Sequence, residues 1–335
     1  MKALVYTQPN RMEIQERPYP QLVAGEVIVK IEAAGVCGSD MHAYHGRDPR
    51  RKPGLVMGHE LAGTVVESAD ARIDAGARVT ANPLITCGRC DHCLQGRGNL
   101  CTDRSMVGMT RPGAFAEFMS IPSSSLVEIP QGLAPAKAAV TEPAATALHA
   151  INLSMRALFR PVPECKTLVI GGGAIGMLSA LLLRSYGCGD ITLAETNALR
   201  RESARLNLAC KVCDPTVDAP ADSAFDYVID AVGAAPTRNM AIASAKPGSV
   251  VMHIGLQSNS SEIDMRKLTL GELTLLGCYT YSTIDMRAAI RAMHHGAFGT
   301  LDWIETRGLS QGAQAFDDLD KGRAASAKLI LQPGG

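Results

Sequence analysis

Hydrophobic positions divide the chain into two regions with different patterns. In the first 150 residues they form short runs of β-type residues that are broken by Gly, Pro and Asp. Four such runs lie at 3–6, 27–31, 63–66 and 78–80. Short β-rich runs with breaks of this kind are typical of strands joined by turns. We therefore expect a strand-rich, irregular domain in this region.

From about Lys166 onward, apolar strand-like runs alternate with helix-like segments. Strands are expected at 167–170, 190–194, 225–229, 249–254 and 273–276, with helices at 174–186 and 197–208. Strands that alternate with helices predict a doubly wound parallel sheet, the α/β class called the Rossmann fold.

Two domains fit this division. We assign residues 1–148 and 297–335 to the strand-rich domain and residues 149–296 to the α/β domain. A helix at 144–158 can bridge them, and a last strand at 327–331 is expected to pack back on the first domain.

Charge and hydropathy exclude two classes of function. The 33 basic and 33 acidic side chains cancel, which argues against a broad nucleic-acid-binding surface. The apolar stretch at 168–183 contains four glycines and is shorter than the ~20 residues needed to span a bilayer. The residues after Met1 lack the apolar segment of a secretory signal, so we expect a cytoplasmic protein without a membrane partner.

A glycine-rich turn follows the expected strand at 167–170. Gly171, Gly173 and Gly176, with Ala174 and Ile175 between the last two, fit the spacing G-x-G-x-x-G at the start of a helix. In that context the glycines permit a tight turn, close approach to a pyrophosphate and close helix–strand packing. The motif predicts a dinucleotide site at the helix N-terminus.

The residues after the next strand indicate which dinucleotide is bound. Glu195 lies roughly 20 residues after Gly176, where a carboxylate can accept hydrogen bonds from the adenosine ribose. This favours NAD over NADP, because a carboxylate repels a 2′-phosphate. Arg200 and Arg201 follow closely. Either could serve that phosphate, but we interpret them as solvated charges on the next helix.

Four of the ten cysteines lie between residues 87 and 101. Cys87, Cys90, Cys93 and Cys101 have the spacing C-x2-C-x2-C-x7-C. Four closely spaced thiolates suit a closed tetrahedral zinc site that organises a segment with little core of its own. Iron–sulfur clusters also use four cysteines, so spacing leaves the metal open.

A different set of ligand types is scattered along the chain. Cys37, His59, Glu60 and Glu142 are each ordinary when taken singly, and their spacing does not join them. His59 and Glu60 are adjacent, and neighbours on a regular strand point to opposite faces. We therefore do not expect those two to share one metal without an irregular backbone.

Several motifs together resemble the zinc-dependent medium-chain dehydrogenases, the family of alcohol, polyol and threonine dehydrogenases. The resemblance extends over nearly the whole chain. The motifs are GVCGSD at 35–40, GHELAG at 58–63, the four-cysteine segment, Glu142-Pro143 with LHA at 148–150, and GGGAIG at 171–176. The resemblance implies that the strand-rich domain is a GroES-like catalytic domain, that 149–296 binds NAD, and that relatives form dimers or tetramers.

The resemblance also implies two zinc ions per chain. Cys37 and His59 would bind the catalytic zinc, Glu142 would supply a third position directly or through water, and Glu60 would be an alternate or exchanging ligand. The four cysteines of 87–101 would hold the structural zinc. Ser39 would begin a proton relay that His42 continues to solvent, and Asp40 would orient the ring of His59.

The implied activity is NAD-dependent oxidation of a secondary alcohol of a polyol or sugar-like substrate to a ketone. Where sorbitol-type relatives carry an Arg-Tyr pair, this chain has Cys278-Tyr279. The missing arginine argues against sorbitol as the substrate. Tyr44, Tyr279 and Tyr281 can still bind substrate hydroxyls. Four cations within 47–52 leave open a sugar-acid or polyol-phosphate substrate. A non-catalytic nucleotide-binding protein is the remaining alternative.

Overall fold

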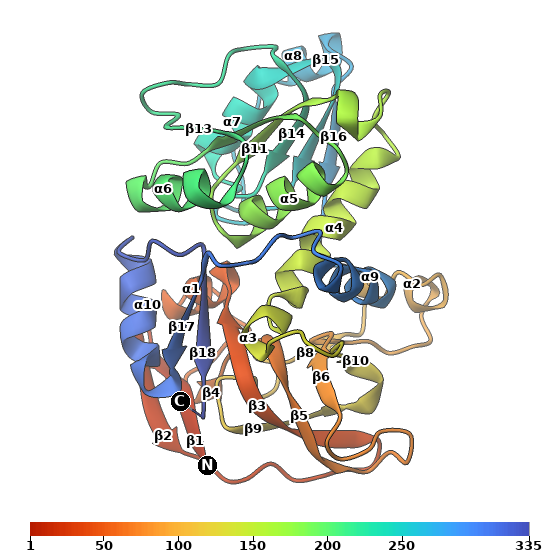
Figure 1. Ribbon diagram of the computed structural model, residues 1–335, viewed down its shortest axis with the longest axis vertical. Helices are drawn as coiled ribbons and strands as arrows, with labels where there is room; N and C mark the ends of the chain where they lie inside the picture. Colours follow the sequence, from red (N-terminus) through yellow and green to blue (C-terminus); the bar gives the residue numbers. More distant parts are fainter. Residues whose placement is uncertain (335) are drawn as a thin grey trace.

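The computed structural model describes residues 1–334 of the chain. Its two halves are stacked along the long axis, with both chain ends in the lower half of Figure 1. The lower half is built mainly of antiparallel strands and the upper half around one parallel sheet.

A seven-stranded sheet forms the framework of the lower half. Its order is β10-β6-β5-β3-β18-β17, and β9 pairs with β3. These strands are β3 (Glu26–Val36), β5 (Glu60–Ser68), β6 (Arg78–Ala81), β9 (Phe118–Pro122), β10 (Leu126–Glu128), β17 (Ile304–Gly308) and β18 (Lys328–Gln332). Because β18 pairs with β3, the prediction that the C-terminal strand packs back on the first domain is confirmed.

Smaller elements complete this half. A three-stranded sheet has the order β2-β1-β4, and a two-stranded sheet joins β7 to β8. The strands are β1 (Lys2–Gln8), β2 (Arg11–Glu16), β4 (Leu55–Val56), β7 (Leu84–Ile85) and β8 (Ser105–Met106). The helices are α1 (Gly38–Tyr44), α2 (Asp91–Leu94), α3 (Pro135–Ala138) and α10 (Gly312–Asp320). Short strands and irregular turns bear out the predicted character of this domain.

The upper half contains a six-stranded sheet in which every neighbouring pair is parallel. Its order is β13-β12-β11-β14-β15-β16. The strands are β11 (Lys166–Ile170), β12 (Asp190–Ala194), β13 (Lys211–Cys213), β14 (Phe225–Asp230), β15 (Ala245–His253) and β16 (Thr274–Gly277). The order reverses between β11 and β14, as in a doubly wound sheet, so the predicted fold class is confirmed.

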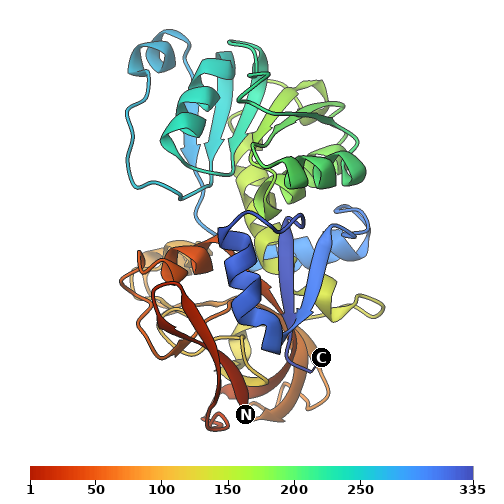
Figure 2. The ribbon, with the colours of Figure 1, turned by 90° about the vertical axis from the view of Figure 1, so that its left-hand side faces the viewer.

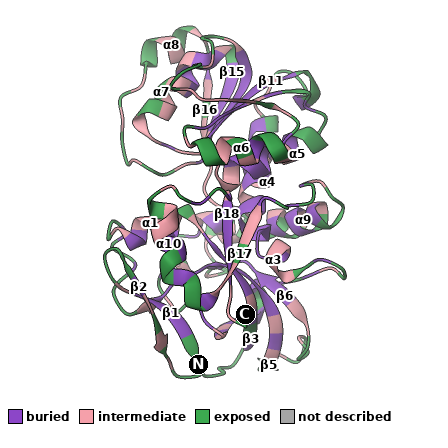
Figure 3. Cartoon of the chain, turned by 60° about the vertical axis from the view of Figure 1, so that its left-hand side comes forward, coloured by how far each residue is buried: buried purple, intermediate pink, exposed green. Residues whose placement is uncertain are grey.

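Helices cover both faces of the parallel sheet. In Figure 2, α7 (Ala235–Ser244) lies on one side of the sheet, and α5 (Ala174–Ser185) and α6 (Ala198–Asn207) lie on the other. The short helix α8 (Met265–Leu270) follows β15. Parallel sheets need apolar side chains on both faces. Accordingly, all six residues of β14 are buried, and Figure 3 shows buried residues concentrated on the strands of both sheets.

Helix α4 (Thr141–Met155) joins the two halves. It packs against α9 (Thr283–His294) and α5, and its core cluster includes Ala33 and Ala62 of the lower sheet as well as residues of the parallel sheet. We expected this helix at 144–158, but it begins three residues earlier, at Thr141. Glu142 consequently lies in its first turn. The expected boundary at 148/149 lies inside this helix, and the domain limits stay a prediction.

Within residues 1–334, no helix is both long and apolar enough to cross a membrane.

Candidate active site

Cys37, His59 and Glu60 lie together between the sheet and the first helix. One ligand atom from each lies within 4.8 Å of the others. Cys37 is the N-cap of α1, directly after β3; His59 precedes β5, and Glu60 is its first residue. Gly35 on β3 pairs with Glu60 on β5. The antiparallel pairing of β3 with β5 therefore joins two motifs that are separate in sequence.

The backbone just before β5 is irregular. Gly58 has φ of +92°, a conformation that glycine adopts readily. A Cβ at this position would lie 2.7 Å from the Phe115 ring. The regular strand begins only at Glu60. The rule that neighbours on a strand point apart does not apply to His59 and Glu60, because this irregular turn separates His59 from the strand.

The buried ring of His59 faces Asp40. His59 Nδ1 lies 3.5 Å from Asp40 Oδ1, and the other carboxylate oxygen accepts a 3.0 Å hydrogen bond from the Cys37 backbone N–H. A carboxylate beside Nδ1 favours a proton on that nitrogen, which would leave Nε2 for a metal. A thiolate, an imidazole and a carboxylate at this separation fit a zinc ion.

Glu60 is paired with a cation from the far end of the chain. Lys328 Nζ on β18 lies 2.6 and 2.7 Å from its two carboxylate oxygens and also donates to the Val36 carbonyl at 2.9 Å. Both side chains of the pair are nearly inaccessible to solvent. Lys328 is a site residue that the sequence did not reveal, because nothing near it in the chain carries a motif.

Glu142 lies outside that three-residue group and has a different partner. Its carboxylate accepts a 2.9 Å hydrogen bond from the Tyr281 hydroxyl. Burial raises the pKa of Glu142 to about 7, and the nearby Glu60 carboxylate contributes to the rise. Tyr281 is completely buried, and its hydroxyl has this carboxylate as its partner.

Ser39 and His42 lie on α1, directly after Cys37. The Ser39 hydroxyl accepts a 3.2 Å hydrogen bond from Arg51. Burial lowers the pKa of His42, and the charge of nearby Arg47 lowers it further. His42 is therefore largely neutral near pH 7, a state in which it can accept a proton.

The four cysteines of 87–101 also form one group, with all four sulfur atoms within 4.8 Å of one another. Two Sγ pairs are 3.5 Å apart, Cys90–Cys93 and Cys87–Cys101, and Cys87–Cys93 is 3.9 Å. Zn–S bonds of about 2.3 Å at tetrahedral angles place sulfur atoms roughly 3.8 Å apart. The donor set and its dimensions therefore fit a closed zinc site.

The glycine-rich turn lies between β11 and α5, at the crevice where the strand order reverses. Gly171 has φ of +101°, and a Cβ on Gly176 would lie 1.8 Å from the Gly171 carbonyl oxygen. Gly173 is the N-cap of α5, and Ala174 and Ile175 begin its first turn. Only glycine fits at 171 and 176, so the geometry is that of a dinucleotide-binding turn.

Comparison with known proteins agrees with this geometry. Residues 23–131 match the family described as "Alcohol dehydrogenase GroES-like domain", and residues 174–295 match "Zinc-binding dehydrogenase". An L-threonine 3-dehydrogenase of Rhizobium johnstonii is 32% identical over 346 aligned residues, covering 99% of this chain and 98% of the relative. The chain belongs to the zinc-dependent medium-chain dehydrogenases. It is therefore an oxidoreductase.

Two further relatives extend the comparison. An L-galactonate-5-dehydrogenase of Escherichia coli K12 is 29% identical over 306 residues, with 88% of each chain covered. A solved structure from Sinorhizobium meliloti 1021 with bound NADP is 30% identical to this dehydrogenase, has a TM-score of 0.88 and covers 99% of each chain.

Glu195 directly follows β12, and Arg200 and Arg201 lie on α6. Glu195 Oε2 accepts a 2.8 Å hydrogen bond from the Gly172 backbone N–H, and Oε1 accepts one from Asn197 at 2.7 Å. Arg201 donates to the Glu195 and Thr196 carbonyls and pairs with Asp214 at 3.0 Å. The interpretation of Arg201 as a solvated charge is therefore wrong, because the turn before α6 engages its guanidinium.

The basic segment at 47–52 also differs from expectation. Arg47, Arg50 and Lys52 are exposed, but Arg51 is buried and its guanidinium is bound to protein atoms. Arg50 pairs with Asp48 at 2.9 Å. Arg51 is thus a structural part of the site, and its charge is not directed at solvent.

Two tyrosines named as hydroxyl binders also have other partners. Tyr44 is buried against Phe316, with ring centroids 5.5 Å apart. Tyr279 lies under the Arg104 guanidinium at 5.0 Å, and its carbonyl accepts a hydrogen bond from Asn99 of the four-cysteine segment. That segment therefore contacts the stretch that leads from β16 toward Tyr281.

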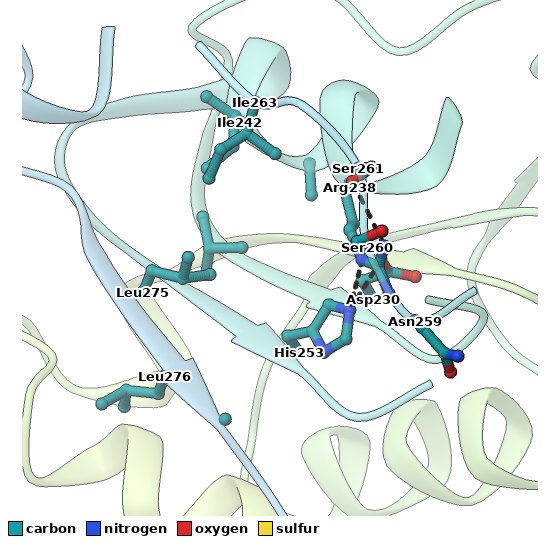
Figure 4. A pocket seen from close by; sticks show the side chains of 13 residues that line it. Asp230, Arg238, Ile242, His253, Asn259, Ser260, Ser261, Ile263, Leu275 and Leu276 are labelled. Atoms are coloured by element: carbon teal, nitrogen blue, oxygen red, sulfur yellow. Dashed lines mark hydrogen bonds and ion pairs between the residues drawn. The ribbon is translucent and has the colours of Figure 1, made fainter. Parts of the chain in front are cut away.

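A separate pocket of about 500 Å³ opens beside the ends of β14, β15 and β16. Figure 4 shows apolar side chains on one side, including Ile242 and Leu275, and a polar cluster around Arg238 on the other. Arg238 donates to His253 Nε2 at 2.9 Å, to Ser261 Oγ at 3.2 Å and to the Ser258 carbonyl. The pocket contains no residue of either candidate metal group, and we assign it no role in the chemistry.

Proposed function

We propose that this dehydrogenase oxidises a secondary alcohol of a polyol or sugar-like substrate to a ketone and transfers the hydride to NAD. The observation that carries the proposal is the group of Cys37, His59 and Glu60, whose ligand atoms lie within 4.8 Å of one another. We assign Cys37 and His59 as ligands of a catalytic zinc. Either Glu142 or Glu60 supplies the third zinc ligand. Glu60 is the alternative to Glu142 because it lies close to Cys37 and His59.

Zinc in such a site acts as a Lewis acid that makes a bound alcohol more acidic near neutral pH. Ser39 accepts the substrate proton, and His42 passes it toward solvent. The neutral state of His42 suits that step. Cys87, Cys90, Cys93 and Cys101 hold a second, structural zinc.

The cofactor is held at the turn of Gly171, Gly173 and Gly176, with Ala174 and Ile175 leading into α5. Glu195 faces the adenosine ribose and favours NAD. The relative with bound NADP makes NADP the alternative, in which Arg200 would serve the 2′-phosphate. The ratio of kcat/KM for the two cofactors distinguishes them, and a preference for NADP would contradict the role of Glu195.

A sugar acid is the second candidate substrate. The relationship to an L-galactonate-5-dehydrogenase favours it, and the exposed Arg47 and Lys52 provide cations that can attract a carboxylate. Lys52→Ala should raise KM for sugar acids severalfold and leave KM for neutral polyols unchanged. Equal effects on both substrate classes would count against this candidate.

The deciding experiment screens NAD-coupled oxidation across polyols, sugar acids and polyol phosphates, with zinc quantified in the same preparation. Cys37→Ala should abolish turnover, lower zinc from about two to one per chain and leave NAD binding intact. A fully active Cys37→Ala enzyme would refute the zinc assignment. Sedimentation of the same preparation tests the expected dimer or tetramer.

A further inference from the structure

Arg51 is the most fully engaged cation near the candidate site. Its side chain has 0% exposure, although it lies in a segment of four cations. The Nε–H donates to the Gly108 carbonyl at 3.1 Å, and Nη1 donates to the Ser39 carbonyl at 2.8 Å and to Asp48 Oδ2 at 3.1 Å. Nη2 reaches Ser39 Oγ at 3.2 Å and Asp40 Oδ1 at 3.3 Å.

Four of these contacts are hydrogen bonds, and the fifth is an ion pair between the guanidinium and Asp40. The side chain is inaccessible to solvent, so Arg51 is unsuited to capturing an acidic substrate. Two of the five contacts go to one residue, Ser39, and they fix both its backbone carbonyl and its hydroxyl oxygen. The other contacts anchor the guanidinium to Asp40, Asp48 and Gly108.

The effect on Ser39 follows from the hydrogen-bonding capacity of a hydroxyl. A serine hydroxyl has one hydrogen to donate and two lone pairs that accept, whereas a guanidinium only donates. The contact with Arg51 therefore occupies one lone pair of Ser39 Oγ. The second lone pair and the hydrogen stay available, which is the minimum needed to receive a proton on one side and release one on the other.

We propose that Arg51 is a positioning residue that orients the Ser39 hydroxyl for proton transfer from the substrate alcohol. The proposal rests on the proposed function. In the oxidation, the substrate O–H bond breaks as a new Ser39 O–H bond forms, and the previous Ser39 proton leaves toward His42 and solvent. The hydride goes to NAD, so Ser39 and Arg51 are unchanged after each turnover.

The test compares Arg51→Lys on two backgrounds. Lysine keeps the charge, but one ammonium has three donors and cannot hold Ser39 at two points and both aspartates together. In the otherwise native enzyme, Arg51→Lys should lower kcat about tenfold, leave KM within threefold and change the solvent deuterium isotope effect on kcat. In a Ser39→Ala background, the same change should lower kcat less than twofold, because the group that Arg51 positions is already absent.

A second readout does not depend on turnover. With saturating NAD, the dissociation constant of trifluoroethanol, measured by calorimetry, should rise about fivefold in Arg51→Lys and stay unchanged when Arg51→Lys is added to Ser39→Ala. Arg50→Ala is the matched control, since Arg50 also pairs with Asp48 but its side chain is 54% exposed. This control should keep kcat within twofold of the native enzyme.

A tenfold loss on both backgrounds would overturn the proposal, because Arg51 would then act independently of Ser39. Unchanged kcat and trifluoroethanol binding in Arg51→Lys would also overturn it. If Arg51→Lys yields no folded enzyme, Asp48→Asn/Arg51→Gln replaces it under the same criteria, since that pair leaves no unpaired carboxylate at 48. Native turnover and its loss in Cys37→Ala test the proposed function separately.

Discussion

Charged side chains around the candidate site are buried in pairs. Arg51 lies against Asp40 and Asp48, and Lys328 lies against Glu60. Removing a charge from water costs several kcal/mol, and this cost is offset only when a partner and further hydrogen bonds are in place. The Val36 carbonyl provides such a bond for Lys328. These pairs hold the site in one arrangement, and loss of either partner should lower the free energy of unfolding.

Lys328→Met is expected to lower the free energy of unfolding by about 3–5 kcal/mol, because it leaves the Glu60 carboxylate buried without its cation. Urea unfolding at matched zinc content, followed by the fluorescence of the single tryptophan, Trp303, measures the change. The double variant Lys328→Met/Glu60→Gln should recover part of the loss. If the double variant is no more stable than Lys328→Met, the ion pair is not the cause.

At the scale of elements, helices α4 and α9 are joined by a polar contact. His149 Nδ1 on α4 lies 2.8 Å from Asp285 Oδ2 on α9, and Asn152 donates to the other carboxylate oxygen at 3.2 Å. Asp285 also caps its own helix through Ser282. Because α4 joins the two halves of the molecule, this contact helps to fix their junction.

Asp285 should make stability depend on pH in the acid range. Burial raises its pKa, but hydrogen bonds from His149 and Ser282 outweigh burial and lower the pKa from 3.8 to about 2. A lowered folded-state pKa means that the stabilisation is complete above about pH 4 and is lost as the pH falls through 2. Asp285→Asn should therefore cost about 2 kcal/mol at pH 7, and the difference from the native protein should shrink toward pH 2. Urea unfolding across this range measures it, and a constant difference would contradict the assignment.

The four-cysteine segment is an element with few apolar contacts of its own. Its helix α2 has four residues and none is buried, so a metal held by the four cysteines would supply order that the segment lacks. Cys93→Ser should lower the thermal midpoint by several degrees and remove about one zinc per chain. Cys210→Ser, directly before β13, is the matched control and should retain both zinc ions. An unchanged midpoint in Cys93→Ser would argue against a structural zinc.

At the scale of the whole molecule, the last strand completes the first domain. β18 lies inside the seven-stranded sheet between β3 and β17, and Leu329, Ile330 and Leu331 are fully buried. Each buried aliphatic side chain contributes about 1.5–3 kcal/mol. Lys328 on the same strand reaches the candidate site. The chain therefore cannot complete either the sheet or the site until its C-terminal residues have been added.

A chain that ends at Ala327 should fail to fold as a soluble protein, because it lacks the three buried side chains and the partner of Glu60. A chain that ends at Gln332 is the control and should retain native zinc content and thermal midpoint. Expression, gel filtration and thermal unfolding of the two chains provide the comparison. A folded, zinc-binding 1–327 chain would contradict the role assigned to β18.

Local sequence patterns determined much of the fold and part of the candidate site. The alternation of strands and helices after Lys166 predicted the parallel sheet, and the glycine spacing predicted the turn between β11 and α5. The spacing of Cys87, Cys90, Cys93 and Cys101 predicted that their sulfur atoms converge. These predictions succeed because the residues involved are neighbours, so backbone geometry and short turns decide their placement.

Only the tertiary structure decided which distant residues meet. The pairing of β3 with β5 brings Cys37 to His59 and Glu60, and Lys328 lies on a strand 268 residues beyond Glu60. Arg51 was one of four cations that left open an acidic substrate, yet it is buried and bound to Ser39. Charge and spacing along the chain do not encode such contacts, because strand pairing and burial between remote segments determine them.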